Sequence, residues 1–317
     1  MELILVTGAT GFLGARLLAR LRGEAFNTRA CVRRNSEFNG SSEDHVCVPD
    51  MNSETNWSEA LVGINWLVHT AARVHVMNEA ATDPLVEFRR VNVDGTLNLA
   101  RQAAAAGVRR FLFLSSVKVN GEFTSAGLPF TEEDPPSPAD AYGVSKNEAE
   151  LGLREIAAQS GMEVVIIRPP LVYGPGVKAN FAALASVVQK GWPLPFAAIH
   201  NKRSLVALDN LVDFIVTCLV HPKAGNQTFL VSDGHDLSTP ELVRGLARWA
   251  GMPARLFSIP VWMLIATGAV LGKRDAVQRL TGNLQVDISK ARKLLDWAPP
   301  IAADEGLKRV MQGGAIQ

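Results

Sequence analysis

Near its N-terminus the chain reads Val6-Thr7-Gly8-Ala9-Thr10-Gly11-Phe12-Leu13-Gly14. The run Leu3–Thr7 is β-rich, and residues 11–21 place leucines on one helical face. In such a strand–turn–helix, Gly8 permits the tight turn, Gly11 lets the backbone approach a pyrophosphate, and Gly14 allows close packing of helix on strand. The N–H groups that begin the helix can then bind phosphate. This context predicts a dinucleotide site in which residues 8–14, Thr10, Phe12 and Leu13 included, contact the cofactor.

Short β-rich runs alternate with helix-length segments, which is typical of βαβ units feeding a parallel sheet. The expected strands are Leu3–Thr7, Thr28–Arg33, His45–Val48, Trp66–Thr70, Arg110–Ser115 and Val164–Arg168. The expected helices are Gly11–Leu21, Thr82–Ala106 and Ala141–Ser160, and Ser238-Thr239-Pro240-Glu241 should open another with a capping box. We expect an α/β protein: a Rossmann-type, doubly wound parallel sheet over residues 1–170 and a smaller, mainly substrate-binding α/β domain over 171–317.

Composition excludes several functions. The formal net charge of the 317 residues is +1, so electrostatic binding of nucleic acid is not expected. The three cysteines, Cys31, Cys47 and Cys218, have no metal-ligand spacing, so we expect no metal site. Their odd number fits a reducing cytoplasm, and the N-terminus shows no signal peptide. A soluble cytoplasmic protein is therefore expected.

One apolar stretch needs a separate interpretation. Residues 256–272 contain no charged side chain and lie between Arg255 and Lys273. The stretch is shorter than the roughly 20 apolar residues that a spanning helix needs. We therefore expect no membrane span but a helix buried in the second domain, with peripheral membrane contact left open.

The end of the second expected strand bears on cofactor choice. An acidic residue there usually binds the adenosine ribose and selects NAD. This chain has Ala30-Cys31-Val32-Arg33-Arg34 instead, with no carboxylate before Glu37. Arg33 and Arg34 can pair with a 2′-phosphate, which favours NADP(H). NAD(H) stays the alternative if this is only a solvated basic loop.

A second group of residues suggests acid–base chemistry. Tyr142 and Lys146 lie one turn apart at the start of an expected helix. A nearby ammonium should lower the pKa of the Tyr142 phenol, which could then exchange a proton with a substrate oxygen. Ser116 follows the strand Arg110–Ser115, at the edge where open α/β sheets bind ligands, and could polarise a carbonyl. With the glycine-rich loop, this trio predicts NAD(P)-dependent hydride transfer at a carbonyl or alcohol carbon.

Taken as a set, these motifs resemble the extended short-chain dehydrogenases/reductases, which include nucleotide-sugar epimerases, dehydratases and ketoreductases. The resemblance runs from residue 3 to about 300. It implies that Ser116, Tyr142 and Lys146 are catalytic. It also implies cofactor contacts, beyond the glycine loop and these last two residues, from Asp50, Met51, Thr70, Ala71, Ala72, Asn92, Ser115, Pro169 and Leu171.

The resemblance also implies where a nucleotide sugar binds and how the chain assembles. Substrate contacts are expected from Ser116, Val117, Lys118, Tyr142, Asn180, Arg203 and Arg279. Without the family resemblance, Arg203 and Arg279 would be interpreted as ordinary surface charges. Relatives also imply a homodimer that pairs helices Thr82–Ala106 and Ala141–Ser160 into a four-helix contact.

One departure narrows the expected activity. Many relatives have Tyr before the Gly of the Ser-Ser segment, where this chain reads Val117-Lys118-Val119-Asn120-Gly121. The variant looks most like bacterial enzymes that act on UDP-N-acetylhexosamines for surface polysaccharide, including O-antigen. We expect NADP(H)-dependent reduction of the C4 keto group of a UDP-4-keto-6-deoxy-N-acetylhexosamine. The alternatives are a UDP-hexose or UDP-N-acetylhexosamine 4-epimerase with tightly bound NAD, and a non-catalytic nucleotide sensor on the same fold.

Overall fold

The computed structural model describes residues 2–24, 26–33, 45–74 and 83–313. In this part of the chain, seven strands form one sheet in the order β3-β2-β1-β4-β5-β6-β9, with every neighbouring pair parallel. They are β1 (Leu3–Thr7), β2 (Asn27–Arg33), β3 (His45–Val48), β4 (Trp66–His69), β5 (Arg110–Leu114), β6 (Glu163–Arg168) and β9 (Thr228–Leu230). The doubly wound sheet expected from the sequence is confirmed. The ends of the six expected strands differ by one residue at most, and β9 is an additional strand that the sequence did not predict.

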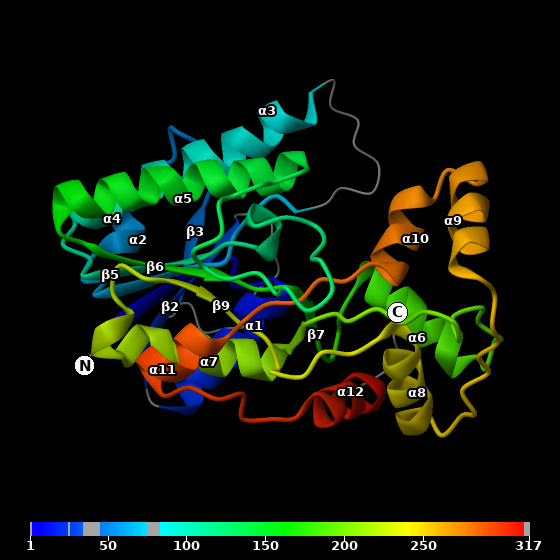
Figure 1. Ribbon diagram of the computed structural model, residues 1–317. Helices are drawn as coiled ribbons and strands as arrows, with labels where there is room; N and C mark the ends of the chain where they lie inside the picture. The colour runs from blue at the N-terminus through cyan, green and yellow to red at the C-terminus, as the bar shows by residue number, and fades with distance from the viewer. Residues whose placement is uncertain (1, 25, 34–44, 75–82, 314–317) are drawn as a thin grey trace.

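Helices cover both faces of this sheet (Figure 1). One face carries α2 (Ser58–Leu61), α3 (Pro84–Phe88), α4 (Thr96–Ala105) and α5 (Ala141–Ser160). The other carries α1 (Phe12–Gly23), α7 (Leu208–Val220) and α11 (Ser289–Leu295). A separate apolar core fills each side, because the strands of a parallel sheet are buried on both faces.

The segment expected as one helix over Thr82–Ala106 has an interrupted helical ladder. Residue 82 lies outside the described residues, and α3 passes into a π-helical segment, Arg89–Gly95, before α4. Asn92 occupies the widened turn, where its side-chain amide donates to the Arg73 carbonyl (3.0 Å) and to the Ser145 hydroxyl (3.1 Å). Such bulges are frequent at functional sites.

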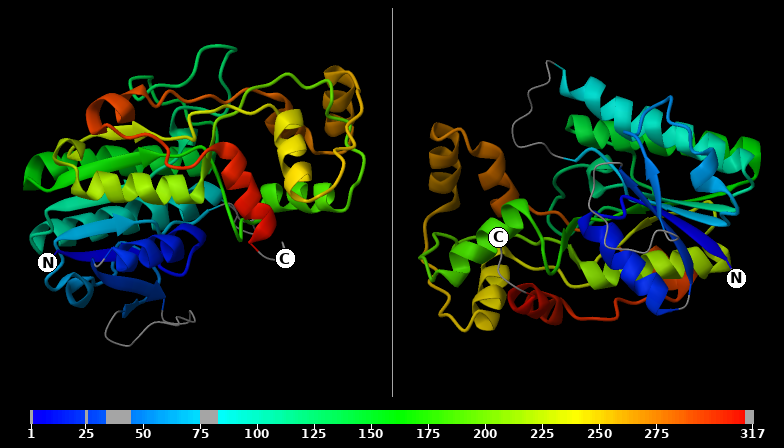
Figure 2. Two further views of the ribbon diagram at one scale, coloured as in Figure 1. Left: turned by 90° about the horizontal axis from the view of Figure 1, so that it is seen from below. Right: turned by 180° about the vertical axis from the view of Figure 1, so that it is seen from behind.

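A smaller lobe is built from the second half of the chain (Figure 2). It contains the two-stranded sheet of β7 (Leu171–Tyr173) and β8 (Leu205–Ala207). Its helices are α6 (Ala179–Gln189), α8 (Thr239–Trp249), α9 (Val261–Val270), α10 (Arg274–Thr281) and α12 (Ala303–Gln312). The capping box predicted at Ser238 is confirmed at the start of α8. The chain returns to the large sheet through α7, β9 and α11.

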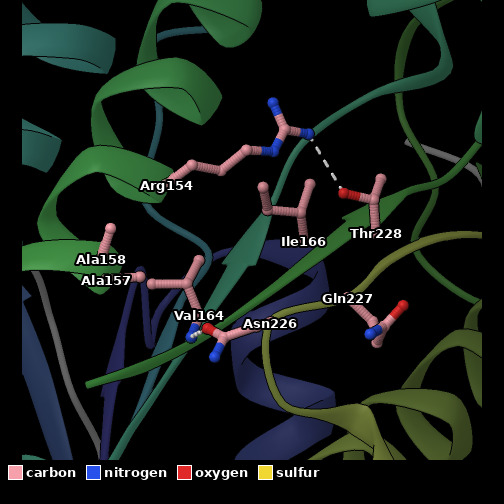
Figure 3. A pocket seen from close by; sticks show the side chains of 8 residues that line it. All are labelled: Arg154, Ala157, Ala158, Val164, Ile166, Asn226, Gln227 and Thr228. Carbon is pink, nitrogen blue, oxygen red and sulfur yellow. Dashed lines mark hydrogen bonds between the residues drawn. The ribbon is translucent and has the colours of Figure 1, made fainter. Parts of the chain in front are cut away.

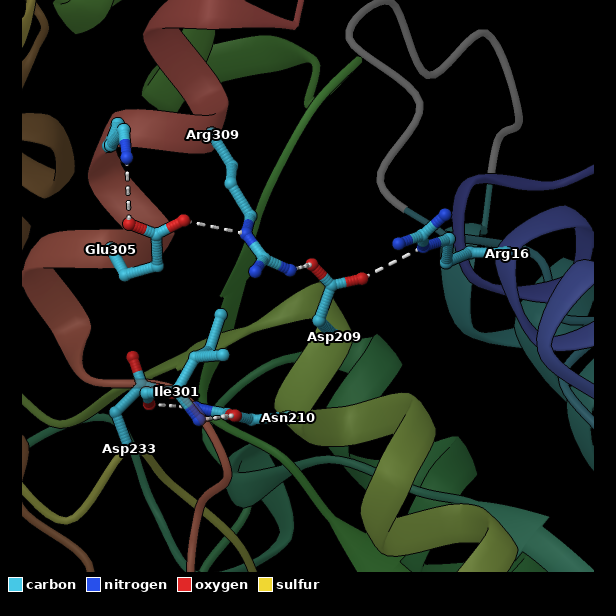
Figure 4. Close-up of polar contacts among 8 residues, drawn as sticks. Arg16, Asp209, Asn210, Asp233, Ile301, Glu305 and Arg309 are labelled. Atoms are coloured by element: carbon cyan, nitrogen blue, oxygen red, sulfur yellow. Dashed lines mark hydrogen bonds and ion pairs between the residues drawn. The ribbon is translucent and has the colours of Figure 1, made fainter.

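Charged side chains join the two halves of the molecule (Figure 4). Asp209 on α7 accepts from Arg16 of α1 (2.8 Å) and from Arg309 of α12 (2.5 Å). Beneath this pair, the buried Asp233 carboxylate accepts from the Asn210 amide and from the Ala207 N–H, both at 2.7 Å. These contacts fix the smaller lobe against the helices that cover the sheet.

The prediction of a buried helix within residues 256–272 is wrong. Helix α9 does form there, but within α9 only Gly268 is buried. Its side chains face outward because α10, the one described element against which α9 packs extensively, covers a single side of it. None of the described helices is long and apolar enough to cross a membrane.

Candidate active site

The glycine-rich turn leaves an open cradle at the start of α1. Gly8 has a left-handed backbone (φ 70°), and a Cβ there would approach Thr70 Oγ1 to 2.7 Å. A Cβ on Gly14 would collide with the backbone of Gly8 and Ala9, so glycine allows α1 to pack against the turn. Gly11 is exposed, and a Cβ there would meet only the Gly8 carbonyl oxygen, at 3.1 Å. No side chain caps the helix, so its first N–H groups face the space where a pyrophosphate would fit.

Further expected cofactor residues lie at the carboxyl edge of the same strands. Thr70 follows β4 and donates its hydroxyl to the Thr7 carbonyl (2.6 Å). Buried His69 is hydrogen bonded to the hydroxyls of Thr7 and Thr96, and burial lowers its pKa to about 3. A neutral imidazole therefore locks β1, β4 and α4 together beside Ala71 and Ala72. Met51 packs against Gly95, at the end of the π-helical segment.

At the end of β2 the structure describes one of the two expected arginines. Arg33 is exposed and pairs with Val48 of β3 in the sheet register. Asp50, which follows β3, is also exposed. Arg34 and Glu37 lie outside the described residues. The choice between NADP(H) and NAD(H) therefore stays a prediction.

The catalytic trio converges where β5 meets the start of α5. Ser116 follows β5, and its hydroxyl accepts from the Lys118 N–H (3.2 Å) as it caps the 3₁₀ turn Val117–Val119. This turn packs against α5, whose first residues include Tyr142 and Lys146. The Lys146 Nζ lies 5.8 Å from the centre of the Tyr142 ring and donates to the Leu114 carbonyl (2.8 Å). The structure thus brings these three sequence-predicted residues to one edge of the sheet.

The electrostatics of the pair differ from the expectation. Burial, with a smaller contribution from the Asp140 carboxylate, raises the pKa of Tyr142. Burial also lowers the pKa of Lys146 to about 7, against a smaller opposing effect of Glu150. The protein surroundings alone therefore shift the Tyr142 pKa in the direction opposite to the lowering expected from Lys146.

The two serines of the Ser-Ser segment have different partners. The Ser115 hydroxyl donates to the buried Glu150 carboxylate (2.6 Å), which also binds Arg168. Ser116 is half-buried and has no such anchor. Glu150 was not singled out from the sequence, because a carboxylate four residues after Lys146 resembles an ordinary helix-surface charge. Glu150 is completely buried instead, and it anchors the carboxyl ends of β5 and β6 through Ser115 and Arg168.

A charged group lies beside the trio in the chain, next to Ser116 and Tyr142. Lys118 forms ion pairs with Asp140 and, at 3.3 Å, with Glu122. Asp140 also caps α5 by accepting from the Gly143 N–H (2.7 Å). The sequence signal that could have revealed Asp140 is its place two residues before Tyr142, in the N-cap position. Val117, also expected to contact substrate, is buried in the apolar core instead.

Arg203 and Arg279 come from distant segments and approach one another. Arg203 donates to the Gly282 carbonyl (3.2 Å), and burial followed by the charge of Arg279 lowers its pKa to about 10. Two guanidinium groups near enough for one charge to act on the other suit a diphosphate. Asn180 is exposed near the start of α6. At the exit of β6, Pro169 accepts from the Val117 N–H (3.0 Å), and Leu171 is 48% exposed.

A cavity of about 320 Å³ lies elsewhere, under the second half of α5 (Figure 3). Arg154, Val164, Ile166 and Thr228 line it, and Arg154 donates to the Thr228 hydroxyl (3.1 Å). None of the sequence-predicted site residues lines this cavity. The free cysteines Cys31 and Cys218 are buried, and the described residues hold no group of histidine, cysteine or carboxylate side chains suited to a metal.

Comparison with known proteins decides the family. Residues 4–232 match the model of the NAD dependent epimerase/dehydratase family. The chain belongs to this family. It is an enzyme of the extended short-chain dehydrogenase/reductase type, so the non-catalytic alternative is excluded.

Individual relatives extend over nearly the whole chain. A UDP-glucose 4-epimerase of Vibrio cholerae is 50% identical over 98% of this chain and 94% of its own length. The solved structure of a Thermotoga maritima UDP-glucose 4-epimerase with UDP-glucose matches with a TM-score of 0.77 at 21% identity, covering 98% of both chains. The NADPH complex of RMD from Pseudomonas aeruginosa matches with a TM-score of 0.73 at 21% identity, covering 98% of this chain and 99% of its own. At these identities the two structures show the shared fold.

Proposed function

We propose that the protein is a 4-epimerase of a UDP-linked hexose or N-acetylhexosamine. Sequence alone places reduction of a 4-keto sugar first, and the observation that moves epimerisation ahead is the 50% identity with the Vibrio cholerae UDP-glucose 4-epimerase. The site supports chemistry at a sugar C4 because Tyr142, Lys146 and Ser116 meet at one edge of the sheet, with Arg203 and Arg279 available for the diphosphate.

The nicotinamide cofactor that fits the cradle of Gly8, Gly11 and Gly14 would take up and return the hydride at C4. Tyr142 exchanges a proton with the sugar oxygen O4. Its raised pKa supplies a protonated phenol when a keto group is reduced. In the oxidising direction the deprotonated phenolate of Tyr142 must accept the proton of O4 instead, and a positive charge on Lys146 would stabilise that phenolate against the effect of burial. Ser116 donates a hydrogen bond to O4 and holds it in place.

A second candidate is NADP(H)-dependent reduction of a UDP-4-keto-6-deoxy-N-acetylhexosamine. Two observations favour it: the basic end of β2 at Arg33, and Asn120 in place of the tyrosine that many relatives carry. Asn120 is buried, and its side-chain amide donates to the Thr131 carbonyl (2.9 Å). For either activity we propose a role in bacterial surface polysaccharide synthesis, including O-antigen, in a homodimer.

One experiment separates the two activities. Purified protein is analysed for bound cofactor and is then incubated with UDP-hexoses, UDP-N-acetylhexosamines and their 4-keto derivatives, with products separated and identified by mass. Epimerisation predicts retained NAD and interconversion of C4 epimers without added cofactor, because the hydride is recycled. Reduction predicts exchangeable NADPH that is consumed in step with a 4-keto sugar. Activity with neither class would overturn both proposals.

Cofactor choice is tested separately through Arg33. If this guanidinium binds a 2′-phosphate, NADPH should bind about tenfold more tightly than NADH, because a charged hydrogen bond contributes roughly 1.5–3 kcal/mol. Arg33→Ala should abolish that preference and leave NADH affinity unchanged. Titrations of both cofactors into both proteins measure this. Equal affinities in the unmodified protein would remove the argument for NADP(H).

A further inference from the structure

The outer end of the smaller lobe carries an exposed apolar surface that the proposed function does not use. We name it the apolar tip; its large side chains are 43–86% exposed and are Phe257, Trp262, Met263, Ile265, Val270 and Leu271. Helix α9 stands at the end of the molecule farthest from the large sheet (Figures 1 and 2). A contiguous patch of this kind on one helix usually marks an interaction surface.

The geometry of α9 separates a packed side from a free side. A Cβ on Gly268 would meet Val277 of α10 at 2.5 Å, so α10 approaches α9 closely there, and Leu264 on the same side is half-buried. Trp262, Ala266 and Val270 recur every four residues on the opposite side, and all are exposed. Apart from the exposed Thr267, the free side of α9 is therefore apolar, whereas exposed helix faces in proteins are ordinarily polar.

Positive charge surrounds this apolar surface. Arg255 precedes α9, and Lys273 and Arg274 follow it directly; all three are exposed. Between residues 252 and 282 the chain has four basic residues, Arg279 included, and one acidic residue, Asp275. The chain as a whole has a formal net charge of only +1, so the excess is local.

The apolar tip is fixed to the lobe through α10 and through the backbone of Phe257. The amide of buried Asn201 donates to the carbonyls of Leu280 and Gly282 (both 3.1 Å), and Thr239 donates to the same Leu280 carbonyl (2.6 Å). The segment that precedes α9 is held by the backbone of Leu194, which is hydrogen bonded to the backbone of Arg255 and Phe257. The tip is thus presented on a firm base.

We propose that the apolar tip docks the protein onto an anionic membrane surface. The apolar side of α9 enters the interface between headgroups and acyl chains, while Arg255, Lys273 and Arg274 contact lipid phosphates. Tryptophan beside basic residues is the composition that membrane interfaces favour. A helix of this length spans about 15 Å, so it lies on the bilayer and does not cross it. A second copy of the chain would instead bring like charges together.

Docking has a consequence for the site. Arg279 lies on α10, whose partner helix carries the tip, and its charge acts on Arg203. When the tip is docked, Arg203 and Arg279 would therefore lie in the lobe that contacts the lipid headgroups. The proposal does not depend on which sugar is turned over.

Co-sedimentation with vesicles tests the proposal. The full chain is incubated with vesicles of phosphatidylglycerol and phosphatidylcholine in equal parts, and with vesicles of phosphatidylcholine alone. We expect binding to the anionic vesicles that weakens as salt is raised, because surface charge is screened. The double variant Trp262→Glu/Val270→Glu should lose at least ~10-fold in affinity through loss of apolar insertion. The triple variant Arg255→Gln/Lys273→Gln/Arg274→Gln should lose on the order of 100-fold, since each basic residue near the surface contributes about fivefold and the three factors multiply.

Matched controls exclude general effects of charge or folding. Val62→Glu changes an apolar residue that is 66% exposed on the large domain, and Arg101→Gln/Lys223→Gln/Arg244→Gln removes three exposed charges elsewhere. Both controls should bind vesicles as the unmodified protein does, and circular dichroism should show all variants folded. Absence of vesicle binding by the unmodified protein would overturn the proposal. So would a change of oligomeric state in the tip variants with vesicle binding unaltered, which would assign the tip to self-association.

Discussion

A lysine is seldom buried, yet Lys146 is only 2% exposed. Its ammonium contacts the Leu114 carbonyl and the face of the Phe113 ring, 4.5 Å from the ring centre. These contacts do not fully replace the hydration of the ammonium, and burial therefore lowers the pKa of Lys146 to about 7. A structural role would be met better by an apolar side chain. The cost of burying this amine is therefore evidence that Lys146 is retained for chemistry.

Stability should register this cost. In the unfolded chain Lys146 titrates near 10.5, so between pH 7 and about 10.5 the unfolded state binds more protons than the folded state. The free energy of unfolding must then rise with pH across this window, and the penalty is fully present below pH 7. Lys146→Met should be more stable to urea than the unmodified protein at pH 7, by on the order of 4 kcal/mol, and by only about 1 kcal/mol near pH 10. A difference that does not change with pH would contradict the assignment.

Tyr142→Phe should lower turnover about 10²–10⁴-fold and leave cofactor affinity nearly intact, since it removes a proton donor and little else. Lys146→Met should impair both turnover and cofactor binding, and Ser116→Ala should be milder because Tyr142 still holds O4. Tyr173→Phe is the matched control: it alters the only other tyrosine, whose hydroxyl is buried on Asp233 (2.6 Å). Steady-state kinetics and cofactor titration measure these effects. Near-normal turnover of Tyr142→Phe would refute the mechanism.

At the scale of elements, the sequence predicts most of what positions the site. The glycine loop, β1 and α5 follow from residue spacing, because periodicity and caps are local properties. The Arg89–Gly95 π-turn does not, since it depends on the contacts of Asn92 with Arg73 and Ser145, which lie far along the chain. The exposure of α9 was missed for a related reason. An apolar run predicts burial, and which face a neighbour covers is a tertiary fact.

The residues of the site also divide into those that local sequence patterns predict and those that only the tertiary structure reveals. Tyr142, Lys146 and Ser116 were found because their spacing and place after a strand carry the signal. Arg203 was found only through family resemblance, since a single arginine after a lysine has no local pattern. Asp140 and Glu150 were missed, because their importance lies in burial and in partners 18 to 22 residues distant.

The end of β6 is joined to the middle of α5 by a buried ion pair that should be sensitive to truncation. Arg168 donates to Glu150 (2.6 Å), and the two side chains are 2% and 0% exposed. Arg168→Met should reduce the free energy of unfolding by about 3–5 kcal/mol, because it leaves a buried carboxylate without its main partner. Adding Glu150→Gln should recover part of the loss. Urea unfolding measures both, with Arg248→Met, from an exposed pair with Asp304, as the control that should change little. An equally small effect of Arg168→Met would show that the pair is dispensable.

At the scale of the whole molecule, two exposed surfaces point in different directions. The apolar tip belongs to the smaller lobe, whereas α3, α4 and α5 form the outer layer of the large sheet (Figure 1). Helices α4 and α5 pack closely, since a Cβ on Gly152 would approach Leu97 to 2.6 Å. The predicted dimer would use this layer and leave the tip free. The two apolar tips of such a dimer could then face the same membrane only if the twofold axis lay along the membrane normal.

We expect a homodimer in which α3–α4 and α5 of one protomer pack against the same helices of its partner. The physical support is that this helical layer presents two large apolar side chains to solvent, Leu151 of α5 (51% exposed) and Val86 of α3 (54% exposed). In a twofold contact each such residue is buried twice, so one substitution has a doubled effect. Leu151→Glu should shift the protein from dimer to monomer at micromolar concentration, whereas Val62→Glu, 66% exposed on the adjoining α2 end, should not. Sedimentation velocity measures the change. If the unmodified protein sediments only as a monomer, the four-helix contact is wrong, and if Leu151→Glu stays dimeric, the contact lies on another surface.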